Sequence, residues 1–413
     1  MPHNSSNLQI PSPGRPGPAF SLTVHVQPTA ATAAAALIAS VAGAVMTETD
    51  HDPGVDLDRI SADTDGPETL LRLCTLLRDR LGTALIHLGD PALDAAATGK
   101  ITQRLCVPAG TPRERALLDT EADHRVIQHL LLNPGSVDSC TGRRHRIALL
   151  SNASAVADLG PLPAAVVLPA LESAAAHLRR TTGLDIYPLP INADTPEDFA
   201  ATAAALAPGF AALCLSHTHP AYVGAVRAAL EHTDTPVVDT TSHAHAVAVT
   251  AAALNALRHK AIPAGEARVT LTGAHHGGDL SGLLTAAGIR TLTLHQSGAP
   301  LVDPAGPADL LIDLTGVPAP RDGTPVLRAC PQNLPPLGAT ASRAHPLHAL
   351  PALLSAAART RRLTPHSLLA AAFALAELAG PGRLLPSVDE PGLAQALASA
   401  LIRDSAHPTD SQS

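Results

Sequence analysis

Two pairs of histidines have the residue type and spacing that could bind a metal ion. One pair is His217 and His219, the other is His243 and His245, and each pair follows a predicted strand. Residues i and i+2 of an extended chain share a face, so each pair could present two imidazoles. Imidazole suits zinc, iron, nickel or copper, which would make this a transition-metal-binding protein. The alternative is that these are ordinary loop histidines, because two such pairs lack the closed ligand set of a structural zinc site.

The composition limits the other classes of function. The 413 residues suffice for two or three domains with cores of their own. The net charge is −8 and the basic residues form no long block, so we expect no nucleic-acid partner. The five cysteines are scattered without a Cys-x-x-Cys pair, which favours a reduced, cytoplasmic protein. The Ala-rich run 30–46 has no basic segment before it, so we expect a packed helix and no membrane association.

The elements that would position these histidines begin after a polar tail, residues 1–19, that we expect to be disordered. Residues 20–97 should form a small α+β domain in the order strand, helix, strand, strand, helix, strand. The predicted strands are 20–26, 45–50, 55–62 and 83–88, and the predicted helices are 29–42 and 67–81. This order is typical of a ferredoxin-like sheet, which ACT-type regulatory domains use. A small metabolite is the partner that such a domain would bind.

Strands and helices then alternate through most of the chain. The predicted strands are 146–150, 185–191, 211–215, 235–239, 267–272, 290–294, 310–314 and 325–330. The predicted helices are 116–132, 169–180, from 196, 220–231, 243–258, 279–287, 346–359, 365–379 and 391–402. This alternation predicts an α/β fold with parallel sheets covered by helices. Residues 404–413 should form a polar tail.

Several segments resemble the malic enzymes. They are residues 183–194, 206–210, 236–257 and 272–288, with 154–161 and Asn133-Pro134. The resemblance is strongest to the bacterial NAD-type enzymes with an N-terminal ACT-like domain. It implies a malic-enzyme N-terminal-type domain at 98–259 and a shortened Rossmann-like NAD-binding-type domain with C-terminal helices at 260–403. It also implies a homodimer or association with a paralogue, while function must be argued from the site.

The resemblance implies a general acid and a general base that this chain lacks. Malic enzymes oxidise malate with a nicotinamide cofactor and decarboxylate the product, which needs an acid, a base and a divalent metal. Asp119 stands where the family has its tyrosine acid, and Ala174 stands where the family has its lysine base. An Asp is ionised at neutral pH, and alanine carries no exchangeable proton.

The metal ligands that the resemblance implies are also replaced. The three positions of the family's carboxylate ligands hold Ser216, His217 and Thr241. Mg²⁺ and Mn²⁺ prefer oxygen ligands, with charged carboxylates among them. We therefore expect no Mg²⁺ or Mn²⁺ site of the family type.

The nucleotide loop of the family is altered as well. Its Gly-x-Gly-x-x-Gly motif corresponds here to Gly273, Ala274, His275, His276, Gly277 and Gly278. The middle glycine lets the backbone approach a pyrophosphate, and His275 would obstruct that approach. The acidic residue expected after the next strand is missing at Leu294-His295-Gln296. NAD is thus the cofactor implied by the family, bound through Gly273, Ala274, Gly277 and Gly278, with a loop poorly suited to it.

These substitutions lead to one hypothesis with two alternatives. The hypothesis is a malic-enzyme-like protein that has lost oxidative decarboxylation of malate, with a metabolite-sensing or regulatory partner role. The first alternative is an active NAD(P)-dependent malate oxidoreductase with substitute residues. The second is the transition-metal protein built on His217, His219, His243 and His245.

Overall fold

The computed structural model describes residues 16–97, 99–102, 104, 109–157, 159–295, 308–316, 323–335 and 337–405. The chain forms two compact units, Met1–Thr102 and Gln103–Ser413. No helix among the described residues is long and apolar enough to cross a membrane. The Ala-rich run predicted as one packed helix contains the ten-residue helix α1, Ala31–Ser40, and then the start of strand β2 at Ala44.

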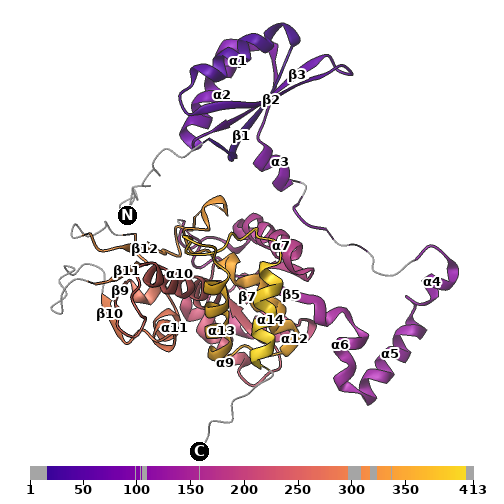
Figure 1. Cartoon of the computed structure of the whole chain (residues 1–413). Helices are drawn as coiled ribbons and strands as arrows, with labels where there is room; N and C mark the ends of the chain where they lie inside the picture. Colours follow the sequence, from indigo (N-terminus) through magenta and orange to yellow (C-terminus); the bar gives the residue numbers. More distant parts are fainter. Residues whose placement is uncertain are drawn as a thin grey trace, which may run out of the picture. The chain divides into compact units, whose positions relative to one another are not determined.

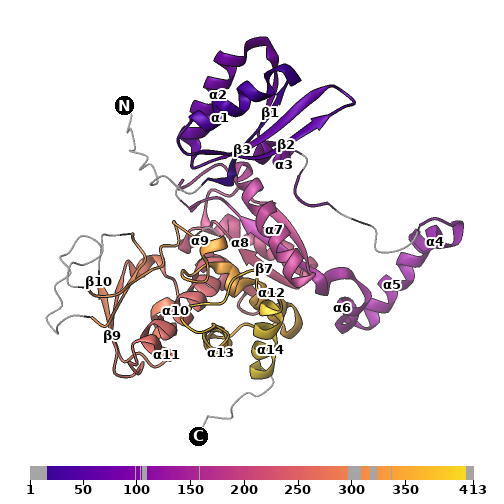
Figure 2. The ribbon, with the colours of Figure 1, turned by 45° about the horizontal axis from the view of Figure 1, so that its top comes forward.

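The first unit has the predicted strand–helix–strand–strand–helix–strand order. Its elements are β1 Gly17–Val26, α1, β2 Ala44–Asp52, β3 Leu57–Thr64, α2 Pro67–Leu81, β4 Leu85–Gly89 and the short helix α3 Pro91–Ala97. The strands form an antiparallel sheet in the order β2-β3-β1-β4. Alternate residues of β1 and β3 face the apolar stripes of α1 and α2, which cover one side of the sheet (Figures 1 and 2). Whether this unit is an ACT-like domain remains a prediction.

The second unit begins with three short helices. They are α4 Pro112–Ala116, α5 Thr120–Leu132 and α6 Val137–Cys140. The sequence predicts one helix over 116–132. The structure instead ends α4 at Ala116 and begins α5 at Thr120, because Asp119 caps the start of α5. Its carboxylate accepts the main-chain N–H of Thr120 at 2.8 Å.

Two parallel sheets with the same strand order form the body of this unit. The first has the order β6-β5-β7-β8 and the second β10-β9-β11-β12. The strands are β5 Arg146–Ser151, β6 Asp185–Pro190, β7 Ala212–Leu215, β8 Val237–Asp239, β9 Arg268–Thr272, β10 Thr291–His295, β11 Leu310–Asp313 and β12 Val326–Arg328. In each sheet the first strand lies between the second and third, which creates a switch point where such folds bind ligands. The α/β class with parallel sheets is therefore confirmed.

Helices cover both sheets and connect them. They are α7 Leu168–Thr182, α8 Pro196–Leu206, α9 Pro220–Leu230, α10 Ala246–His259, α11 Leu280–Ala286, α12 Leu350–Thr360, α13 Pro365–Glu377 and α14 Leu393–Ser405. Helix α10 is buried over most of its length and contacts both β11 and α13. The side-chain amide of Asn255 on α10 donates to the carbonyls of Ala376 and Leu384, at 2.9 Å each. Figure 1 shows α12, α13 and α14 grouped together, and α13 packs against α10.

Two of these helices start later than the sequence predicts. The helix expected from residue 243 begins at Ala246, because Thr240–His245 forms a π-helical turn. The helix expected from residue 346 begins at Leu350, after a 3₁₀ turn at Pro346–His348. Both irregular turns lie at the candidate site, and π-type turns are frequent at functional sites.

Candidate functional site

A cavity of about 490 Å³ lies where strands of both sheets end. Its wall comes from the segments that follow β5, β7, β8, β9 and β12, together with α7 and the start of α12. The polar lining residues are His177, Ser216, His217, Thr218, His219, Asp239, Thr240, Thr241, Ser242, His245, His275, His276, Gln332 and His345. In open α/β sheets ligands bind outside the carboxyl ends of the strands, so this is the position expected of a ligand site.

Asp239, the carboxylate in this wall, accepts hydrogen bonds from the main chain. It is 2% exposed, and it accepts the main-chain N–H groups of Thr241, at 3.1 Å, and Ser242. These bonds hold the start of the π-helical turn. Burial raises the pKa of Asp239, and the hydrogen bonds from Ser242 act against that rise. Its Oδ1 accepts both bonds and therefore caps the turn.

His245 lines the cavity and has a buried polar atom that is unpaired. The residue is 2% exposed, and its Nε2 has no hydrogen-bond partner within the described part of the chain. Burial, and then the neighbouring His345 and His348, lower the pKa of His245 to about 3. A buried polar atom without a partner is costly, and it requires an explanation.

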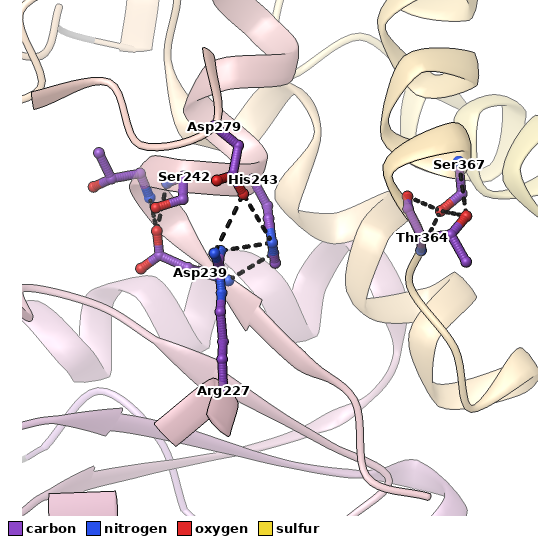
Figure 3. A network of polar contacts seen from close by, with 8 residues as sticks. Arg227, Asp239, Ser242, His243, Asp279, Thr364 and Ser367 are labelled. Atoms are coloured by element: carbon purple, nitrogen blue, oxygen red, sulfur yellow. Dashed lines mark hydrogen bonds and ion pairs between the residues drawn. The ribbon is translucent and has the colours of Figure 1, made fainter. Parts of the chain in front are cut away.

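His243 points away from this cavity. Its Nε2 lies 2.7 Å from Nη2 of Arg227 and 3.7 Å from Oδ2 of Asp279 (Figure 3). Arg227 also pairs with Asp279 at 3.3 Å. Burial, and then the charge of Arg227, lower the pKa of His243 to about 3. This group lines a second cavity of about 840 Å³ beside α9, α11 and the start of α13, where Figure 3 shows Thr364 and Ser367.

The four-histidine metal site predicted from the sequence is not formed. His243 and His245 lie on a helical turn instead of an extended segment, so they face different cavities. His219 is exposed and uses its Nδ1 to accept the N–H of Ala221, at 3.3 Å, at the start of α9. His217 has a positive φ of 52°, and burial lowers its pKa. Among the described residues, no group of three or more His, Cys, Asp or Glu side chains could hold a metal ion.

The positions singled out by the resemblance do gather at the 490 Å³ cavity. Ala174, Ser216, His217 and Thr241 all line it. Asp119 does not line it, because it is the exposed cap of α5. The base and metal-ligand positions implied by the resemblance are therefore neighbours in the structure, whereas the acid position lies elsewhere.

The retained glycines of the nucleotide-type loop pack against protein atoms. Gly273 has a φ of 70°, and a Cβ there would overlap the side chain of Thr315. A Cβ on Gly278, whose φ is 54°, would lie 2.8 Å from Cα of Ser242. A Cβ on Gly277 would lie 2.8 Å from Cδ1 of Leu314. Ala274 begins a 3₁₀ turn through His276, and the rings of His275 and His276 lie 3.9 Å apart.

Three polar residues at the cavity or in the core were not predicted from the sequence. His177 and His345 line the 490 Å³ cavity, although no spacing connects them to the other histidines. Asp313 ends β11 fully buried, and it accepts bonds from Thr315 and Arg328. Burial alone would raise the pKa of Asp313, but hydrogen bonds from Thr315 and its other partners lower it overall. A buried acid that follows three apolar residues was the available signal for Asp313.

An α/β protein with a ligand cavity at the ends of two parallel sheets is the class that this geometry defines. No protein-family model matches the chain. It is 26% identical over 225 residues to the NAD-dependent malic enzyme of Geobacillus stearothermophilus. The matched region covers 53% of this chain and 47% of that enzyme. It is 26% identical over 177 residues to the NADP-dependent malic enzyme of Halomonas elongata, covering 43% of this chain and 42% of that one. The matches thus span about half the length of these relatives.

Solved structures agree on the fold. The NAD-dependent malic enzyme of Thermotoga maritima superposes with a TM-score of 0.66 at 19% identity, over 76% of this chain and 99% of that one. The malic enzyme of Pyrococcus horikoshii superposes with a TM-score of 0.65 at 21% identity, over 74% and 86%. The chain is therefore a homologue of the malic enzymes, with their α/β fold.

Proposed function

We propose that this malic-enzyme-like protein no longer catalyses the oxidative decarboxylation of malate and acts in metabolite sensing or as a regulatory partner. The observation that carries the proposal is Ala174, which lines the cavity at the position of the family's lysine base. Proton abstraction from the 2-hydroxyl of malate needs a group with an accessible pKa within hydrogen-bond reach. A methyl group cannot perform this step in any environment.

The metal chemistry of the family has no matching donor set here. Ser216, His217 and Thr241 stand at the ligand positions, and the neighbouring Asp239 already caps two main-chain N–H groups. Mg²⁺ and Mn²⁺ take carboxylate and other hard oxygen ligands, so these residues do not fit the family's ion. Without the ion, the enolate that follows decarboxylation would lack its stabilising charge.

The glycine loop supports the same proposal. A dinucleotide-binding loop uses glycine so that its backbone can approach the pyrophosphate. Here Gly273 and Gly278 are explained by close contact with Thr315 and Ser242. Their retention therefore does not require a bound nucleotide, and His275 occupies the position of the middle glycine.

A rate measurement tests the proposal. Purified full-length protein is incubated with malate, Mn²⁺ and either NAD or NADP, and absorbance at 340 nm is followed. We expect no rate above that of an Ala174→Leu variant prepared in parallel, since a bulkier side chain there would obstruct any reaction in the cavity. A malate-dependent rate in the wild type that this variant abolishes would overturn the proposal and favour the active oxidoreductase.

A further inference from the structure

A third cavity, of about 700 Å³, lies between the C-terminal ends of α7 and α12, helix α14 and the 3₁₀ turn Gly142–His145. It shares no lining residue with the 490 Å³ cavity. Its charged lining residues are three arginines and one carboxylate, namely Arg144, Arg359, Arg361 and Asp138. The whole chain has a net charge of −8, so this excess of cations is local. A cleft lined by positive charge concentrates anions.

The one carboxylate of this lining is already paired. Oδ1 of Asp138 lies 3.2 Å from Nη1 of Arg143, which stands beside the cavity. Within the described part of the chain, no salt bridge joins Arg144, Arg359 or Arg361 to an acid. Burial, and then the charge of Arg143, lower the pKa of Arg361, while Asp138 acts against this. The positive charges around the cavity are therefore only partly balanced by the protein itself.

Two of the three arginines have accessible guanidinium groups. Arg144 is exposed, and its Nε donates to Nε2 of His145 at 2.9 Å, which leaves both of its Nη groups unpaired among the described residues. Arg359 is exposed, and its side chain makes no hydrogen bond or ion pair with a described residue. Arg361 differs, because its Nη1 donates to the carbonyl of Ala211 at 2.9 Å and so links the end of α12 to the start of β7. Arg144 and Arg359 are thus the cations that a ligand can reach.

The uncharged part of the lining offers further hydrogen-bonding groups. Gln395 and Ser399 are exposed, and neither side chain has a hydrogen-bond partner in the part of the chain that the structure describes. They lie four residues apart on α14, so they share one face of that helix. A volume of about 700 Å³ is within the range of small-molecule sites, and it exceeds what an inorganic ion needs.

We propose that this cavity binds a small organic anion, whose phosphate or carboxylate group is held by Arg144 and Arg359. Guanidinium groups bind both of these oxyanions through paired N–H donors. Gln395 and Ser399 would bond to hydroxyl groups on the rest of the ligand. The inference goes beyond the proposed function, because it concerns a separate cavity and does not depend on whether malate is oxidised.

Isothermal titration of the full-length protein at pH 7.5 and low ionic strength tests this proposal. Ribose 5-phosphate and ribose differ in the phosphate group, and succinate carries a similar charge on two carboxylates. We expect saturable binding of ribose 5-phosphate or succinate, with a Kd at or below ~1 mM, and no binding of ribose. The anion that binds more tightly identifies the oxyanion. Added salt should weaken the binding, because it screens the guanidinium charges.

Substitutions place the binding at this cavity. Arg144→Gln and Arg359→Gln should each raise the Kd at least ~10-fold, because each removes charge-assisted hydrogen bonds. Arg403→Gln is the matched control, since Arg403 is exposed on α14, does not line the cavity and loses the same charge. It should bind like the wild type, and circular dichroism should show that all three variants are folded.

Two results would overturn the proposal. One is that neither anion binds to the wild type. The other is that the double variant Arg144→Gln, Arg359→Gln keeps a Kd within ~2-fold of the wild type, which would locate the binding elsewhere in the chain. Malate turnover in the rate assay would instead remove the proposed function and leave these expectations unchanged, so the two failures are distinguishable.

Discussion

Acid should destabilise the unit that carries the cavity, because two buried histidines resist protonation in the folded state. His243 and His245 each have a folded-state pKa of about 3, against an ordinary value of 6.5. Below pH 6.5 the unfolded chain binds a proton at each position, while the folded chain stays neutral there until about pH 3. Stability therefore falls as the pH is lowered through this window.

The size of the effect follows from the width of the window. Each pH unit is worth about 1.36 kcal/mol per proton, so lowering the pH from 6.5 to 5 costs roughly 2 kcal/mol for each histidine. These two residues give roughly 4 kcal/mol, a large share of the 5–15 kcal/mol that is typical of folded domains. His345, whose pKa is lowered to about 4, adds to the loss in the same direction. Both side chains are at least nine-tenths buried, so screening by solvent reduces this figure little.

Urea denaturation followed by far-UV circular dichroism at pH 6.5 and pH 5 measures this loss. His245→Leu should reduce the loss by roughly 2 kcal/mol, because one of the two protons is no longer taken up on unfolding. His124→Gln, at an exposed position on α5, should leave the loss as in the wild type. A pH-dependent loss of the same size in His245→Leu and wild type would refute the reasoning.

Three further substitutions test the framework around the cavity, each by urea denaturation. Asn255→Leu should cost about 2–3 kcal/mol, because two buried carbonyls lose their donor. Asp313→Asn should cost about 2–3 kcal/mol at pH 7, and the difference from the wild type should shrink as the pH falls below 3.8, because the unfolded carboxyl then binds a proton while the native one, with its lowered pKa, resists it. Gly278→Ala should cost at least ~1 kcal/mol through its positive φ and its overlap with Ser242, whereas Gly282→Ala on α11 should be neutral or slightly stabilising. Equal stabilities of the two glycine variants would contradict the packing explanation.

The fold was largely predictable because hydrophobic patterning and capping signals agree along the chain. Helix α2 begins and ends where the sequence predicts, at Pro67 and Leu81. Every strand predicted between residues 20 and 330 overlaps an observed strand. The errors fall at element starts, as at Asp119 and Thr240, where a side chain caps a turn that periodicity does not detect.

The site was predictable in part. Neighbouring strands in a parallel sheet bring their following residues together, so Ser216 and Thr241 could be placed at one edge from the resemblance. The direction of each side chain could not be inferred, because it depends on whether the segment is extended or helical. That difference separates His243 from His245 and removes the predicted metal site. His345 lies far along the chain from the other lining histidines, before the turn Pro346–His348, and tertiary packing places it at the cavity.

The polar residues in the segment around Asp239 have roles within the fold that do not depend on a reaction. The carboxylate of Asp239, the last residue of β8, accepts two hydrogen bonds, and both come from the turn that follows it. Two threonines follow it where a metal-binding protein of this family would need further carboxylates. The strand, the turn and α10 require Asp239 as a cap and Asn255 as a link to α13, and these requirements are independent of malate. The contacts within the fold therefore suffice to explain Asp239 and Asn255.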